Sequence, residues 1–380
     1  MKVVVAIDSF KGSLSSLEAG NAVKEGILAA MPEARVYISP IADGGEGTVL
    51  ALALGMNGRL EHVEVTGPMG TRTCCTYGRI PDTDTAIIEM AGAAGITLIS
   101  AEERNPLHAT TFGVGEVIKD AIQKGCRHFI VGIGGSATND GGVGMLQAFG
   151  FGMLDKEGKQ VPLGAKGLER LEEVSDEHVI PELKECTFRV ACDVTNPLCG
   201  QNGCSNVFGP QKGATPEMVQ KMDAWLSRFA RLTSEKYEKA DAEIPGTGAA
   251  GGLGFAFLSY TNAVLESGIK IILEETRLEE HVKDADIVIT GEGRLDGQTI
   301  FGKAPIGVAR IAKKYGKKVI AFSGSVTKDA KTCNEYGIDA YFPVLRKIQT
   351  LQEAMDSSNA RENLKDTAEQ VFRLINKMID

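Results

Sequence analysis

The chain has 380 residues, of which 43% are hydrophobic and 24% charged, proportions typical of a soluble globular protein. The net charge is −9, and the sequence has no sustained run of basic residues. Both observations argue against a nucleic acid or an anionic membrane as a partner. The apolar N-terminal segment, which ends at Asp8, is too short for the core of a signal peptide, and no apolar run reaches membrane-spanning length. We therefore expect a cytoplasmic protein. The eight cysteines form no Cys-x-x-Cys pair, which favours reduced thiols over a zinc site.

The N-terminal part of the chain alternates strands and helices. Residues 3–7 and 36–41 have the apolar composition of buried strands. The helix between them begins with a capping box, Ser15-Ser-Leu-Glu18, and ends before Pro32. Another helix is expected after Thr48. This βαβα order predicts a parallel sheet with helices packed on it.

The pattern changes at Leu60. Residues 60–65, 72–80 and 86–90 predict an antiparallel meander, which is typical of a different domain. After Asp284 the alternation of strands and helices resumes, and the tail has the apolar stripe of a docked terminal helix.

These patterns predict an α/β fold of two α/β domains with a cleft between them. Residues 1–66 and 283–380 would form a discontinuous Rossmann-like domain with a parallel sheet. Residues 67–282 would form an inserted, mixed α/β domain. Ligands of parallel α/β sheets bind beyond the carboxyl ends of the strands, so the polar, glycine-containing loops that follow strands are the candidate site.

The segment from His128 to Gly144 contains a buried strand, a glycine-rich loop and the start of a helix. Glycine lets the backbone approach a ligand closely, and a helix N-terminus offers free N–H groups to an anion. We therefore predict that this loop binds phosphate; the alternative is a tight turn without a ligand. The candidate residues are Gly134, Gly135, Ser136, Thr138, Asn139, Gly141 and Gly142.

Two motif matches are weak. Residues 297–303 have the spacing of a phosphate-binding loop, but Ala304 replaces the Ser or Thr that holds magnesium. Residues 246–251 have the dinucleotide-binding spacing, but the preceding Ile244-Pro245 is no strand. Neither match indicates a family, although Lys303 stays a candidate for the site.

Several polar loops occur together and in a fixed order along nearly the whole chain. They are Asp8-Ser-Phe-Lys-Gly-Ser13, Pro40-Ile-Ala-Asp-Gly-Gly-Glu-Gly-Thr48, Gly134-Gly-Ser-Ala-Thr-Asn-Asp-Gly-Gly142, Ala191-Cys-Asp-Val-Thr-Asn-Pro197, Val207-Phe-Gly-Pro-Gln-Lys-Gly213, Gly248-Ala-Ala-Gly-Gly-Leu-Gly254 and Gly291-Glu-Gly-Arg-Leu-Asp296. In this ordered set the chain resembles the bacterial glycerate kinase family of the first type. The resemblance implies phosphorylation of D-glycerate by ATP with Mg²⁺, giving 2-phosphoglycerate in preference to 3-phosphoglycerate. D-glycerate is then the expected small-molecule partner, and a second copy of the chain, in a homo-oligomer, is a further candidate partner.

Phosphoryl transfer depends on positioning and charge neutralisation, which suggests roles for the charged loop residues. Mg²⁺ prefers carboxylate oxygens, and Asp43 and Glu46 are the candidates. A carboxylate must also orient the attacking hydroxyl and take its proton. Asp193 is our first candidate for this base, and Asp296 competes with it.

The carboxylate of glycerate requires a cation. Lys11 and Arg294 are the candidates for this cation, and Lys212 and Lys303 are reserve candidates for the same role. Lys11 is also predicted to be a catalytic residue, together with Asp193 and Asp296. Ser9 and Asn196 complete the predicted substrate-binding residues.

Two other functions remain as alternatives. An NAD-dependent oxidoreductase of a small hydroxy acid would need a glycine fingerprint after a strand and an acidic residue about twenty positions on. Gly132-x-Gly-x-x-Ala137 approaches the fingerprint, but no following strand supplies the acid. A non-catalytic sugar-acid-binding protein would not need the carboxylates, which are all present.

Overall fold

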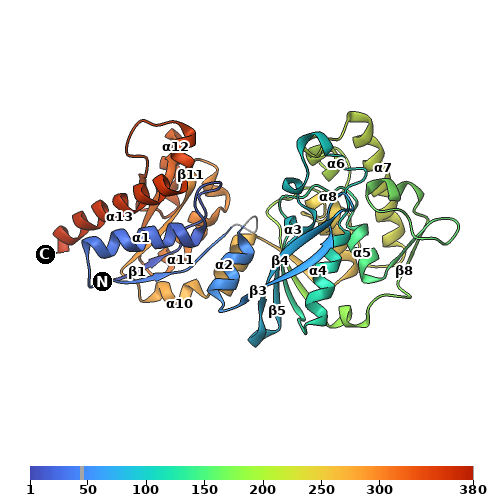
Figure 1. Ribbon diagram of the computed structural model, residues 1–380, viewed down its shortest axis with the longest axis horizontal. Coiled ribbons are helices and arrows are strands. Elements are labelled where there is room, and N and C mark those ends of the chain that lie inside the picture. The colour runs from blue at the N-terminus through green and yellow to red at the C-terminus, as the bar shows by residue number, and fades with distance from the viewer. Residues whose placement is uncertain (43–46, 380) are drawn as a thin grey trace. The chain divides into compact units, whose positions relative to one another are not determined.

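The computed structural model describes residues 1–42 and 47–379. The contacts divide the chain into two compact units. Within the described residues, unit 1 contains residues 1–42, 50–56 and 269–379, and unit 2 contains residues 47–49 and 57–268. Both ends of the chain therefore contribute to unit 1, the blue, orange and red part of Figure 1.

Unit 1 is built on a five-stranded parallel sheet with the order β13-β12-β11-β1-β2. Its strands are β1 (Lys2–Val5), β2 (Arg35–Ile38), β11 (Ile287–Leu295), β12 (Lys318–Val326) and β13 (Ala340–Pro343). The first strand pairs with β2 on one side and with β11 on the other, and the later strands continue outward from β11. The strand order therefore reverses between β1 and β11, which is where open α/β sheets bind ligands.

Unit 1 has seven helices within its described residues. They are α1 (Ser16–Ala30), α2 (Thr48–Gly55), α9 (Gly268–Glu275), α10 (Leu278–Lys283), α11 (Ala304–Lys314), α12 (Leu351–Met355) and α13 (Ser357–Ile379). Of these, α1, α11 and α13 contact the sheet. The predicted capping box of α1 is confirmed, because Ser15 and Glu18 exchange side-chain and backbone hydrogen bonds. The first and last long helices, α1 and α13, lie side by side (Figure 1). Gly26 permits this approach, because a Cβ there would clash with the carbonyl oxygen of Lys365.

Unit 2 is built on a six-stranded mixed sheet with the order β10-β9-β6-β5-β4-β3. The strands are β3 (Arg59–Thr66), β4 (Arg72–Ile80), β5 (Thr85–Glu89), β6 (His128–Gly132), β9 (Thr187–Ala191) and β10 (Ala263–Glu266). The four strands from β5 to β10 are parallel, whereas β3 and β4 are antiparallel to their neighbours. A separate two-stranded ladder joins β7 (Gly152–Leu154) to β8 (Glu173–Ser175).

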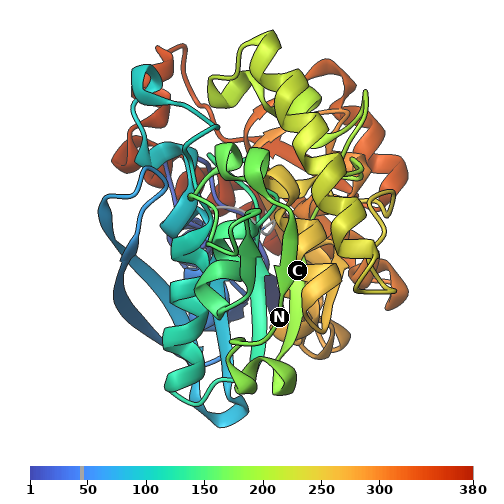
Figure 2. The same ribbon diagram turned by 90° about the vertical axis from the view of Figure 1, so that its right-hand side faces the viewer.

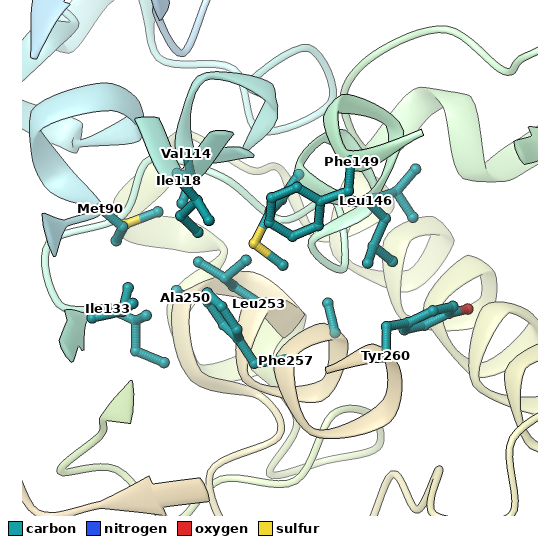
Figure 3. Close-up of a cluster of buried hydrophobic side chains, with 14 of the residues drawn as sticks. Met90, Val114, Ile118, Ile133, Leu146, Phe149, Ala250, Leu253, Phe257 and Tyr260 are labelled. Atoms are coloured by element: carbon teal, nitrogen blue, oxygen red, sulfur yellow. The ribbon is translucent and has the colours of Figure 1, made fainter. Parts of the chain in front are cut away.

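Helices surround this sheet, as Figure 2 shows for unit 2. They are α3 (Ala91–Ala94), α4 (Phe112–Gln123), α5 (Val143–Phe149), α6 (Cys204–Phe208), α7 (Pro216–Ser234) and α8 (Ala249–Tyr260). The core brings together buried side chains of α4, α5 and α8, among them Ile118, Phe149 and Leu253 (Figure 3). This packing holds both ends of the glycine-rich loop that follows β6.

The predicted α/β class is confirmed, with one parallel and one mixed sheet. The positions at which the chain passes from one unit to the other differ from the predicted domain limits at residues 66 and 283. Strand β3 pairs with β4 along its full length and so belongs to unit 2. Helices α9 and α10 belong instead to unit 1, where α10 packs on α11. Among the described residues, no helix is long and apolar enough to cross a membrane.

Candidate active site

Unit 1 has a cavity of about 410 Å³ at the carboxyl ends of its parallel strands. It is lined by the loops after β1 and β13, by the C-terminal ends of β11 and β12, and by the segment after β11. The segment from α12 to the start of α13 completes the lining. Four residues predicted from the sequence line this cavity, namely Ser9, Lys11, Arg294 and Asp296, as does the reserve candidate Lys303. The topology thus brings together charged residues from both ends of the chain at the switch point of the sheet.

Two acidic side chains that line the cavity are buried, Asp8 and Glu292. No role was predicted for Glu292 from the sequence. The hydroxyl of Thr299 donates a 2.6 Å hydrogen bond to its Oε1, and Lys303 Nζ lies 3.5 Å from its Oε2. Burial raises the pKa of Glu292, while the contacts with Thr299 and Lys303 oppose this shift. A buried carboxyl with a shifted pKa beside a lysine in a cavity is typical of a functional site. Its place in a glycine-containing loop after a strand was the signal available in the sequence.

Asp296 combines a local structural role with a place among charged groups. Its Oδ1 accepts a 3.0 Å hydrogen bond from the N–H of Gln298 and lies 3.7 Å from Lys303 Nζ. Its Oδ2 lies 3.5 Å from Arg294 Nε. The polar end of the cavity therefore alternates carboxylates with cations, an arrangement that can bind an anion and orient a hydroxyl group.

The two predicted magnesium ligands, Asp43 and Glu46, lie outside the described residues. Within residues 1–42 and 47–379, no group of three or more His, Cys, Asp or Glu side chains could hold a metal. Mg²⁺ in phosphoryl-transfer sites commonly takes one or two carboxylates and completes its shell with phosphates and water. Glu292 and Asp296 supply carboxylate oxygens of this kind, and they lie near each other because Lys303 Nζ is 3.5 Å from one and 3.7 Å from the other.

The glycine-rich loop of unit 2 is largely internal. Gly134 and Gly135 are exposed, whereas Ser136 is 8% exposed and Thr138 and Asn139 are fully buried. The side-chain amide of Asn139 donates to the hydroxyl of Ser205 at 2.8 Å. Gly141 and Gly142 adopt left-handed backbone conformations, with φ of 66° and 77°, that turn the chain into α5. The role of these residues in binding a nucleotide remains a prediction.

One argument for a phosphate site in this loop is wrong, because the N–H groups at the start of α5 are not free. The carboxylate of Asp140 accepts hydrogen bonds from the N–H groups of Gly142 and Gly144. The N–H of Met145 donates to Thr111 Oγ1, whose hydroxyl itself donates to Asp140. A buried protein carboxylate therefore occupies the position that the sequence analysis assigned to a ligand anion. Burial raises the pKa of Asp140, and these hydrogen bonds oppose the shift.

Lys212, a reserve candidate for the glycerate carboxylate, does not line the unit 1 cavity. Its side chain is buried in unit 2, at 2% exposure, where Nζ donates to Ser136 Oγ at 2.9 Å and to the carbonyl of Thr138 at 2.7 Å. Burial lowers the pKa of Lys212 to about 8. Lys212 therefore stabilises the glycine-rich loop through hydrogen bonds on the buried side of the loop.

The buried ammonium of Lys212 predicts a stability that depends on pH. Between about pH 8 and the ordinary pKa of lysine, the unfolded chain binds a proton that the folded chain has lost, so stability should rise with pH. Relative to Lys212→Met, the wild-type free energy of unfolding should increase by on the order of a few kcal/mol across that window. Urea titrations of both proteins at several pH values measure the difference. A constant difference would show that the folded lysine keeps its ordinary pKa.

Asp193 and Asn196 follow β9 at the carboxyl edge of the unit 2 sheet. Asp193 is exposed, and its Oδ1 accepts a 3.1 Å hydrogen bond from the N–H of Gly268. Asn196 donates from Nδ2 to the carbonyl of Asn202, and its own carbonyl accepts from Gly246 and Gly248. The two candidate bases, Asp193 and Asp296, thus lie in different units of the chain.

Comparison with known proteins gives the family. The family model described as the glycerate kinase family matches residues 3–376. The chain belongs to the glycerate kinase family. The chain is 47% identical to glycerate 2-kinase of Escherichia coli K12, and the match covers 93% of both chains. It is 46% identical, over 99% of both chains, to the glycerate kinase of Haemophilus influenzae.

The structural comparison agrees with the family. This glycerate kinase family member resembles the crystal structure of a protein described as glycerate kinase 2 from Salmonella typhimurium LT2, with a TM-score of 0.91. That chain is 46% identical, and the match covers 99% of this chain and 98% of the other. The family predicted from the ordered loops is therefore confirmed.

Proposed function

We propose that the chain transfers the terminal phosphoryl group of ATP to the 2-hydroxyl of D-glycerate in the presence of Mg²⁺. The observation that carries the proposal is the 47% identity to a relative named glycerate 2-kinase, over 93% of both chains. The charged cavity of unit 1 supports it, because Lys11, Arg294 and Lys303 there can attract a carboxylate or phosphates. Localised cations are required, since the chain as a whole carries a net charge of −9.

In this proposal the residues of the chain mainly position the reactants and compensate charge. The oxygen of the glycerate hydroxyl forms a bond to the phosphorus as the bond to the leaving ADP oxygen breaks, and a carboxylate accepts the hydroxyl proton. Asp193 is the first candidate for that carboxylate, and Asp296 is the second. Magnesium, when bound with ATP, would neutralise the charge that develops on the phosphate oxygens.

The remaining predicted residues have supporting roles in the same proposal. Ser9 follows β1 and lines the cavity beside Lys11, where its hydroxyl can bind the acid. Asp43 and Glu46 remain the predicted magnesium ligands, with Glu292 as a further carboxylate of the right kind. In unit 2, the exposed backbone of Gly134 and Gly135 is the part of the glycine-rich loop that a phosphate can reach.

Product analysis by NMR tests the proposal. The purified protein is incubated with D-glycerate, ATP and Mg²⁺, and the ³¹P signal of the product is recorded with proton coupling. A phosphate on the 2-position couples to one proton and gives a doublet, whereas a phosphate on the 3-position couples to two and gives a triplet. We expect the doublet. A triplet would show that the 3-hydroxyl is phosphorylated instead. The absence of any phosphorylated product from folded protein would contradict the proposal.

Parallel assays separate the alternative functions. Reduction of NAD with D-glycerate would favour the oxidoreductase. Calorimetric binding of glycerate without turnover of ATP would favour a sugar-acid-binding protein. Lactate and glycerol serve as further acceptors, because glycerol lacks the carboxylate that Lys11 and Arg294 are proposed to bind.

A further inference from the structure

The unit 1 cavity has two chemically different walls. The charged wall, described above, is formed by the loop after β1, the C-terminal end of β11 and the segment that follows β11. The other wall is apolar and follows β13, and we call it the apolar wall. It consists of Val344, Leu345, Leu351, Ala354 and Met355.

Large side chains of the apolar wall are exposed at the cavity. Leu345 is 41% exposed, Leu351 is 78% exposed and Met355 is 38% exposed. Single exposed apolar residues are ordinary, but several around one cavity indicate a surface that a ligand covers. Helix α12, which carries Leu351, Ala354 and Met355, begins with a complete capping box between Thr350 and Glu353.

Contacts join the apolar wall to the charged wall. The hydroxyl of Ser357, which begins α13, donates a 2.7 Å hydrogen bond to the carbonyl of Ser13 in the loop after β1. A Cβ on Gly12 would lie 2.8 Å from Met355 Cε, so the same loop packs directly against the methionine. A single bound molecule can therefore touch both walls.

D-glycerate alone would leave the apolar wall of this cavity uncovered. It is a three-carbon acid with a polar group on every carbon, and it offers no apolar surface to the leucines and the methionine. The cavity of about 410 Å³ instead lies within the range of roughly 300–1,000 Å³ that holds larger organic ligands. ATP matches both walls, because its base has two apolar faces and its other end carries several negative charges.

We propose that the apolar wall of unit 1 binds the adenine of ATP, with the phosphates directed towards the charged wall, where Lys303 faces them. The thioether of Met355 is suited to this contact, since sulfur interacts favourably with aromatic rings. The place also agrees with the strand order, because the cavity begins at the switch point between β1 and β11. This inference rests on the proposed function, and it adds the location of the nucleoside.

NMR of the methionine methyl groups tests the inference without measuring activity. The protein is labelled with ¹³C-methyl methionine, and the signal of Met355 among the eleven methionines is assigned with Met355→Leu. We expect ADP with Mg²⁺ to shift this signal through the ring current of adenine, whereas tripolyphosphate and D-glycerate should leave it nearly unchanged. An unmoved signal at saturating ADP, or a shift caused by D-glycerate alone, would overturn the inference.

A pair of matched variants tests the energetic contribution of the wall. Leu351→Asp places a charge where adenine would lie, and it should weaken ADP binding by about tenfold or more in calorimetry. The added carboxylate also repels phosphates, so the affinity for tripolyphosphate should fall as well, but much less than the affinity for ADP. The control is Leu374→Asp on α13, a 62% exposed leucine that does not line the cavity. Equal ADP affinity in Leu351→Asp and the control would overturn the inference.

The outcomes also separate this inference from the proposed function. If glycerate is phosphorylated while ADP leaves Met355 and Leu351 unaffected, the function stands and the nucleoside binds elsewhere. If ADP shifts the Met355 signal but no phosphoglycerate forms, the nucleotide site stands and the proposed reaction fails.

Discussion

Replacing Asp193 with Asn is expected to lower kcat by about 10²- to 10⁴-fold, the usual contribution of a general base. The substitution preserves the shape of the side chain, and its amide oxygen can still accept the hydrogen bond from the N–H of Gly268. The loss should therefore come from the missing negative charge. Steady-state kinetics gives kcat, and calorimetry with ATP should show a nearly unchanged Kd.

Companion variants decide which carboxylate has this role. Asp296→Asn removes the competing candidate, and Glu292→Gln removes the buried carboxylate of the same cavity. Asp223→Asn is the matched control, because Asp223 also accepts a hydrogen bond from a backbone N–H, that of Gly200, but has no proposed role. If Asp193→Asn stays near wild type while Asp296→Asn is crippled, the base lies in unit 1.

The regular elements were predictable because their side chains repeat with the period of the backbone. The strand at His128–Gly132 and the helix at Val143–Phe149 agree with the sequence prediction, and so does the capping box at Ser15. Two edge elements were missed, β10 at Ala263–Glu266 and β13 at Ala340–Pro343. Each has four residues and no fully buried run, so neither carries a distinct pattern.

The unit 1 cavity was partly predictable from topology. Lys11 and Arg294 are far apart in the sequence, but Lys11 follows β1 and Arg294 lies at the C-terminal end of the neighbouring parallel strand β11, so both are at the same edge of the sheet. The interior of unit 2 was not predictable in the same way. Lys212 and Asp140 look like loop residues in the sequence, and only tertiary packing determines that both side chains are buried. The glycine-rich loop therefore has an internal network that its composition does not reveal.

Replacing Lys303 with Met is expected to lower kcat/KM by about 10²- to 10³-fold, as removal of one charged or donating group from a transition-state site commonly does. Lys303 Nζ lies 3.5 Å from Glu292 and 3.7 Å from Asp296, and it lines the cavity proposed to hold the phosphates. Without it, two neighbouring carboxylates face an anionic nucleotide with one cation fewer. Steady-state kinetics with D-glycerate and Mg²⁺-ATP measures the loss.

The pH dependence of the same variant shows whether Lys303 also acts through Glu292. Burial raises the pKa of Glu292 and Lys303 lowers it, so Lys303→Met should raise it further. If activity requires ionised Glu292, the acid limb of kcat/KM moves to higher pH in Lys303→Met and stays in place in Lys303→Arg. Lys314→Met, on the exposed side of the same helix, is the control and should change neither quantity. A large loss of activity with an unmoved acid limb would mean that Lys303 acts on the phosphates alone.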